Sequence, residues 1–146
     1  MRTALPLILL LVFPNIAIAD SKKDISSLCS EMAKQLALPG GININTSRGT
    51  FKDAYDNVEH RGCRLSAGGD INSHPDYYSY LMRLYPTKNN PLGREHWQPD
   101  RQSDGPDGSS FTISRGNRFC QVSGSWNDKF FNYQIECGRK IEIRRR

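Results

Sequence analysis

Apolar residues recur at helical spacing near the start of the chain, over residues 24–38. The apolar positions are Ile25, Leu28, Cys29, Met32 and Leu36. Asp24 stands where a helix cap is preferred, and Pro39-Gly40-Gly41 interrupts the pattern at its other end. We therefore expect a helix over residues 24–38, with its apolar stripe facing the core of the domain.

The next segment suggests a short strand followed by a second helix. Residues 42–45 alternate between isoleucine and asparagine, which is typical of a strand. Thr50, followed three residues later by Asp53, resembles the start of a capped helix. This pattern predicts a helix over residues 51–61, with His60 near its end.

The middle of the chain is richer in turn-forming residues. Residues 66–76 contain many Gly, Asn, Ser and Asp residues and are expected to form a loop. Residues 76–85 fit either a helix that starts after Pro75 or an alternating strand, and we favour the helix. Residues 86–110 hold four prolines and form the longest irregular stretch, which in a compact domain is usually functional or disordered.

The last third of the chain alternates like β-strands. The predicted strands are residues 111–114, 118–126, 129–137 and 140–143, with turn-forming residues between them. Helices in the first part and strands in the last predict an α+β domain. In this prediction, two or three N-terminal helices pack on a C-terminal antiparallel sheet of three to four strands, stapled by disulfides.

Four cysteines, an even number, indicate two disulfides in an exported protein. Three pairings are formally open. If Trp126 lies opposite Phe131 in a hairpin, Cys120 lies opposite Cys137, within bonding range. That register favours the pairs Cys120–Cys137 and Cys29–Cys63. The sequence has no C-x-x-C motif, so zinc or another metal is not expected.

The first 19 residues have the features of a secretory signal. Arg2 precedes an apolar run over residues 4–18, and Ala17-Ile18-Ala19 supplies the small residues that a signal peptidase requires. A transmembrane anchor is the alternative, but the run is shorter than about 20 residues and is broken by prolines. We therefore expect residues 1–19 to be removed, leaving residues 20–146 as one small periplasmic or extracellular domain with no membrane span.

The chain is basic, with a formal net charge of +5 and a pI of about 9.2. This excess favours acidic partners and allows weak binding to polyanions. The positive residues are scattered, apart from Arg144-Arg145-Arg146 at the end. One interpretation is therefore an envelope protein that binds polyanions through scattered Lys and Arg residues. The charge alone does not indicate nucleic-acid binding.

One segment in the long irregular stretch brings chemically useful side chains together. Arg94-Glu95-His96-Trp97 offers a cation, a carboxylate, an imidazole and an aromatic ring. In a small secreted hydrolase of the nuclease type, His96 would be the general acid or base, Glu95 its partner, and Arg94 a stabiliser of the anionic transition state. A solvated loop with Trp97 held in the core explains the same residues without catalysis.

No motif specifies a catalytic centre, a metal site or a cofactor, so a binding domain is favoured over an enzyme. The most concrete form is an inhibitor or immunity-type protein that blocks another secreted or envelope protein. Residues 86–108 would enter a cleft of the partner, and the expected contacts are Arg94, His96, Trp97 and Arg101, because aromatic and arginine side chains anchor protein interfaces. The hydrolase that uses His96 and Glu95 remains the alternative.

Overall fold

The computed structural model describes residues 20–55 and 57–140, with side chains from residue 27 onward. The elements are α1 (Asp20–Leu36), β1 (Asn43–Lys52), β2 (Glu59–Asp70), α2 (Tyr77–Met82), α3 (Pro91–Arg94), β3 (Gln98–Gly105), β4 (Gly108–Arg115), β5 (Arg118–Trp126) and β6 (Phe130–Arg139). The predicted signal, residues 1–19, and most of the predicted last strand lie outside the described residues. Within the described part of the chain, no helix combines the length and apolar character needed to cross a membrane.

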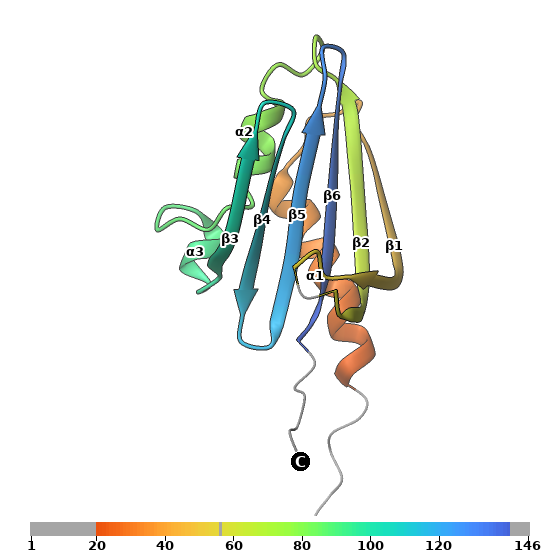
Figure 1. Cartoon of the computed structure of the whole chain (residues 1–146), viewed down its shortest axis with the longest axis vertical. Coiled ribbons are helices and arrows are strands. Elements are labelled where there is room, and N and C mark those ends of the chain that lie inside the picture. Colours follow the sequence, from red (N-terminus) through yellow and green to blue (C-terminus); the bar gives the residue numbers. More distant parts are fainter. Residues whose placement is uncertain (1–19, 56, 141–146) are drawn as a thin grey trace, which may run out of the picture.

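The six strands form one sheet in the order β1-β2-β6-β5-β4-β3, and all neighbouring strands are antiparallel. Helix α1 crosses behind the sheet, and α2 and α3 belong to the connection between β2 and β3 (Figure 1). We call the side on which α1 and α2 pack the covered face and the opposite side the open face.

The predicted α+β arrangement with a three- to four-stranded C-terminal sheet is wrong. Residues 20–55 and 57–140 are mostly β-sheet, with six antiparallel strands and three short helices. Residues 43–52 and 59–70 form the long hairpin β1–β2. The predicted short strand 42–45 overlaps its start, but a second helix and a loop were expected over most of the rest. Residues 98–105, expected to be irregular, form the edge strand β3.

Glycines account for part of the wrong prediction over β2, where a helix end and then a loop were expected. A Cβ at Gly62 would lie 1.9 Å from the carbonyl oxygen of Cys137, and one at Gly68 would lie 2.8 Å from that of Phe131. Both contacts involve the backbone of β6, which pairs with β2. These glycines therefore permit close strand packing instead of marking a turn.

Residues 51–61 do not form a helix because Asp53 stabilises a turn. Its Oδ1 accepts a hydrogen bond of 2.8 Å from the Tyr55 N–H, and its own N–H donates to the Val58 carbonyl at 2.9 Å. An aspartate that binds the backbone two residues on is a common turn device. On either side of this turn, Phe51 pairs with His60 in the ladder.

Several other predictions are confirmed. The first helix ends close to its expected boundary, and α2 is helical as favoured. Trp126 lies opposite Phe131, as the proposed register required. Both disulfides form as predicted: Cys29–Cys63 joins α1 to β2, and Cys120–Cys137 crosses between β5 and β6.

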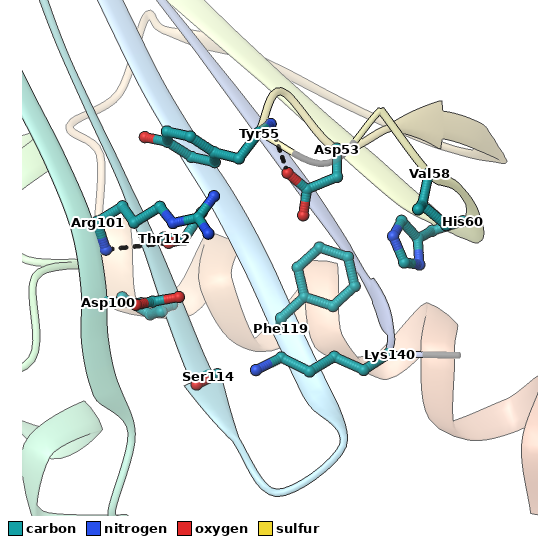
Figure 2. A pocket seen from close by; sticks show the side chains of 11 residues that line it. Asp53, Tyr55, Val58, His60, Asp100, Arg101, Thr112, Ser114, Phe119 and Lys140 are labelled. Atoms are coloured by element: carbon teal, nitrogen blue, oxygen red, sulfur yellow. Dashed lines mark hydrogen bonds between the residues drawn. The ribbon is translucent and has the colours of Figure 1, made fainter. Parts of the chain in front are cut away.

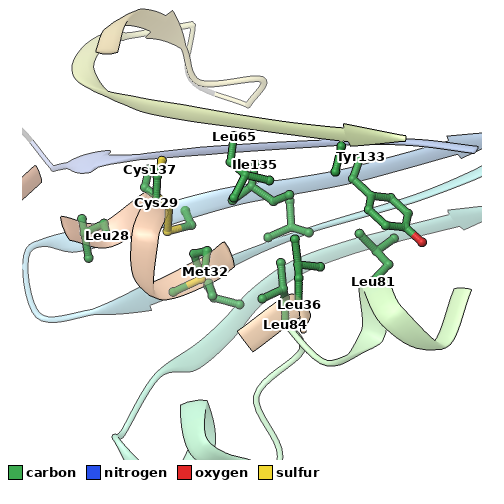
Figure 3. Packing of buried hydrophobic residues seen from close by; sticks show 14 of the residues in the cluster. Leu28, Cys29, Met32, Leu36, Leu65, Leu81, Leu84, Tyr133, Ile135 and Cys137 are labelled. Atoms are coloured by element: carbon green, nitrogen blue, oxygen red, sulfur yellow. A yellow bond between two sulfur atoms is a disulfide. The ribbon is translucent and has the colours of Figure 1, made fainter. Parts of the chain in front are cut away.

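The main core lies between the covered face and the helices. Leu28, Met32 and Leu36 of α1 face Leu65 and Ile135 of the sheet, and all five are at most 1% exposed (Figure 3). Farther along the sheet, α2 and the turn after it contribute two more buried leucines, Leu81 and Leu84. Burying this apolar surface is the main stabilising contribution of the fold.

Candidate functional site: a cleft on the open face

The open face carries a cleft with a volume of about 310 Å³ (Figure 2). It lies between the tip of the β1–β2 hairpin and strands β4 and β5, beside the edge strand β3. The lining residues are Asp53, Tyr55, Val58, His60, Asp100, Arg101, Thr112, Ile113, Ser114, Phe119 and Lys140. We call this feature the open-face cleft.

The first wall of the cleft is the hairpin tip, which folds over the open face. The side chain of Gln121 on β5 holds it in place. Its Oε1 accepts a hydrogen bond of 2.9 Å from the Ala54 N–H, and its Nε2 donates to the Lys52 carbonyl at 3.3 Å. The tip is therefore fixed to the sheet on both sides of Asp53.

The opposite wall is shaped by a β-bulge in β3. The ladder pairs Pro99 with Ile113 and then Gln102 with Phe111, so two residues of β3 oppose the single residue Thr112 of β4. The hydroxyl of Thr112 accepts a hydrogen bond of 3.2 Å from the Arg101 N–H. Bulges bend a strand and redirect its side chains. Here, the bulge accompanies an Arg101 side chain that reaches across the open face toward the hairpin tip.

The two walls meet in an aromatic–arginine pair at the mouth of the cleft. The Arg101 guanidinium carbon lies 4.5 Å from the centre of the Tyr55 ring. Tyr55 is 43% exposed, and Arg101 is also exposed. A stacked cation and ring of this kind is stabilised by the negative face of the ring. The pair presents a preformed, amphipathic surface at the mouth.

The floor of the cleft contains His60, which is 4% exposed. Its Nδ1 lies 3.1 Å from the Arg139 carbonyl oxygen, and a carbonyl can only accept, so this nitrogen carries the proton. Its Nε2 is buried and has no hydrogen-bond partner among the residues that the structure describes. The ring packs between Phe51 and Phe119, with centroid distances of 5.9 and 4.7 Å.

Charges of both signs surround the cleft. Asp53 and Asp100 contribute carboxylates, while Arg101 and Lys140 contribute cations. This balance differs from the positive groove expected for a polyanion. A mixed-charge cleft with an aromatic rim suits a polar surface that offers both donors and acceptors.

The four residues expected to contact a partner do not converge on one site. Arg101 lines the open-face cleft, but Trp97 is 1% exposed and belongs to the main core. Arg94 is the last residue of α3, and His96 follows in a left-handed turn with φ of +65°. The structure thus fits the alternative in which Trp97 is held in the core.

Glu95 is held by Arg115, and the described residues show no hydrogen bond between Glu95 and His96. The Arg115 Nη1 lies 3.1 Å from Glu95 Oε2, and its Nη2 lies 4.0 Å from Glu31 Oε1. The guanidinium also lies 4.9 Å from the Trp97 ring centre. Burial, followed by the hydrogen bond with Glu95, raises the pKa of Glu31, and the charge of Arg115 only partly opposes this shift. This cluster joins α1, the turn after α3 and β4.

The predicted long loop, residues 86–108, is largely ordered by local contacts. The side chain of Asn90 accepts a hydrogen bond of 2.9 Å from the Gly93 N–H at the start of α3. A Cβ at Gly93 would lie 1.9 Å from the Thr87 carbonyl oxygen, so the segment closes tightly on itself. Leu92 is fully buried beneath it. These residues therefore form local turns, α3 and the edge strand β3, and their entry into a partner's cleft stays a prediction.

Three cysteine sulfurs, those of Cys29, Cys63 and Cys137, lie within 4.8 Å of one another on the covered face. The grouping arises because Cys63 and Cys137 are register partners and each belongs to a disulfide. Sulfurs bonded in this way are not available as thiolate ligands.

Sequence reasoning missed Tyr55, His60 and Thr112 as members of one site. They come from the hairpin tip, β2 and β4, and nothing in their spacing links them. Comparisons with protein-family models, with curated proteins and with solved structures found no match to this chain. The fold and the cleft therefore define only its class: a disulfide-linked antiparallel-sheet protein with a mixed-charge cleft on its open face.

Proposed function

We propose that this protein is a non-enzymatic binding domain that holds another secreted or envelope protein against its open face, most concretely as an inhibitor or immunity-type protein. The two disulfides indicate an oxidising compartment outside the cytoplasm. Cleavage of residues 1–19 and release into the periplasm or the extracellular space are part of this proposal.

The Tyr55–Arg101 pair at the mouth of the cleft is the observation that carries the proposal. Tyrosine and arginine are enriched among the residues that dominate binding energy, because they combine large contact area with directed polar groups. The cleft behind them lies at the lower end of the volumes typical of ligand pockets, ~300–1,000 Å³. Such a pocket fits an anchoring side chain of a partner.

The site differs from the one expected from sequence. Arg101 keeps its role, Tyr55 takes the place of the buried Trp97, and Arg94 and His96 lie outside the cleft lining. The partner would contact walls that hydrogen bonds of Gln121 and Thr112 already hold in place, which lowers the ordering cost of binding.

The test is affinity capture with the oxidised protein as bait, exposed to its own envelope and medium and washed at low and high salt. The wild type should retain one protein in a fixed ratio through high salt. The double variant Tyr55→Ala/Arg101→Ala should weaken that binding by at least about 30-fold. The matched control Arg94→Ala/His96→Ala changes the same number of exposed side chains and should bind within about twofold of the wild type.

Two outcomes would count against this proposal. Retention of polyanions only, released steeply by salt, would favour the polyanion-binding interpretation. Loss of the partner in the Arg94→Ala/His96→Ala control, with full binding by the double variant, would move the site to the end of α3.

A further inference from the structure

The sheet ends in two edge strands that are built differently. In β3, Pro99 and the bulge opposite Thr112 interrupt the ladder. Proline and bulges are among the means by which natural proteins protect an edge from pairing with another strand. In β1, residues 43–52 keep an unbroken register with β2 and include no proline.

The outer side of β1 is open over residues 43–50. Residues 43–50 are all exposed, and the sheet order places no described strand beyond β1. Figure 1 shows β1 at the margin of the sheet, with α1 behind the inner strands. Every second residue of an edge strand turns its N–H and C=O away from the sheet, so β1 offers a regular row of backbone donors and acceptors.

A groove of mixed polar and apolar lining runs beside this edge on the covered face. It has a volume of about 550 Å³ and lies between α1, which contributes Ser27 and Ser30, and β1, which contributes Thr46 and Arg48. Successive side chains of a strand point to opposite faces. A strand added to β1 would therefore direct every second side chain toward this groove, where hydroxyl groups and a guanidinium lie.

The charge of the edge indicates the kind of strand that fits. Arg48 and Lys52 are the charged residues of β1, both are positive, and both are exposed. Arg48 makes no ion pair with any described residue. A second copy of β1 paired centrally and antiparallel would bring two Arg48 side chains close together with no carboxylate between them, which is unfavourable. A strand that carries carboxylates would instead complement both cations.

We propose that β1 is a strand-addition site for an extended acidic segment of a partner protein, with glutamate or aspartate side chains facing the groove. Backbone hydrogen bonds would supply the affinity and Arg48 the selectivity for acidic residues. This site goes beyond the open-face cleft and shares no lining residue with it. Each proposal can therefore fail without the other.

The first measurement is fluorescence anisotropy with a labelled probe and the oxidised protein. The probe is the blocked peptide Val-Glu-Thr-Glu-Val-Glu-Thr-Glu-Val, and the control peptide replaces each Glu by Lys. The acidic peptide should bind and the lysine peptide should not. Arg48→Glu should weaken binding of the acidic peptide by at least about tenfold. Lys88→Glu makes the same charge change on the exposed connection between α2 and α3 and should stay within about twofold.

N-methylated probes test backbone pairing on the unaltered protein. Methylation of one alternate set of amides should abolish binding, and methylation of the other set should leave it within about threefold, because only one set faces the edge of β1. Amide hydrogen exchange should slow in β1 when the acidic peptide binds and should stay unchanged in β3.

Four results would overturn the proposal. These are equal binding of the lysine peptide, equal effects of the two methylated sets, protection of β3 instead of β1, and dimerisation through β1 in sedimentation without any peptide. The last result would assign the edge to a second copy of the chain.

Discussion

The covered and open faces of the sheet are built from alternate residues of the same strands, yet they serve different ends. On β2, Leu65 is fully buried against the helices, while its neighbour Arg64 is exposed on the open face. On β6, Ile135 is buried in the main core, while its neighbour Gln134 is exposed on the open face. The covered face carries most of the apolar burial and both disulfides, which leaves the open face free to present polar and charged groups.

One part of the open face departs from this division. Phe51 and Phe119 are 6% and 4% exposed beneath the hairpin tip and lie outside the main core cluster. Their rings are 5.9 Å apart, and His60 packs against both. This small second cluster supports the floor of the open-face cleft with closely packed rings.

The largest loss of stability should come from removing the disulfide that links the covered face to α1. Removing the Cys29–Cys63 disulfide with Cys29→Ala/Cys63→Ala should cost about 4 kcal/mol, because it closes a loop of 34 residues. Removing Cys120–Cys137, with a separation of 17, should cost about 3 kcal/mol. Urea unfolding of both variants would measure the two losses of unfolding free energy. A larger loss for Cys120–Cys137 would show that loop length does not set the stabilisation by these two disulfides.

Two adjacent substitutions on β2 should compare how much each face of the sheet contributes to stability. Leu65→Ala should destabilise the protein by about 3 kcal/mol, because it leaves a cavity in a fully buried site. The adjacent Ser66→Ala on the open face should stay within about 0.5 kcal/mol. Thermal and urea unfolding would test both variants. Equal losses of unfolding free energy would contradict the claim that the covered face contributes most of the stability.

The smallest expected change in stability concerns Glu31, in the cluster that joins α1, β4 and the turn after α3. Its folded pKa is raised above the ordinary value of 4.5, mainly by burial. Protonation of Glu31 therefore stabilises the fold below about pH 4.5, and this contribution is lost as the pH rises through the folded pKa. Glu31→Gln should gain stability relative to the wild type between pH 4 and pH 7.

The control for that experiment is Glu59→Gln, an exposed carboxylate at the start of β2. It should leave the pH dependence of the unfolding free energy close to that of the wild type. If Glu31→Gln instead loses stability toward neutral pH, the ion pair with Arg115 outweighs burial in this cluster.

The sequence predicted the structure correctly where the spacing of residues within one short segment is enough to define it. The stripe of α1, the hairpin β5–β6 and the pairing Cys120–Cys137 all follow from spacing and register within short stretches. It failed at β2, where Gly62 and Gly68 resemble loop residues until the backbone of β6 is known to lie against them. It failed again at Asp53, because a helix cap and a turn cap use the same side chain.

The candidate site was less predictable than the fold. Arg101 was expected to bind a partner, but its neighbour in space, Tyr55, lies 46 positions earlier in the chain. The two meet only because the hairpin tip folds over β5 and the bulge opposite Thr112 shapes the facing wall. Trp97 was expected to contact a partner, but it is 1% exposed and fills part of the core.

By itself, the sequence determined the first helix, the C-terminal hairpins, the two disulfides and the basic charge, because each depends on residue type and short-range spacing. Only the tertiary structure decided which glycines are strand residues, which edge of the sheet stays open and which side chains surround the cleft. These properties depend on contacts between β1–β2 and the C-terminal strands, which are far apart in the chain. Such contacts form only when the whole sheet assembles, so no local pattern records them.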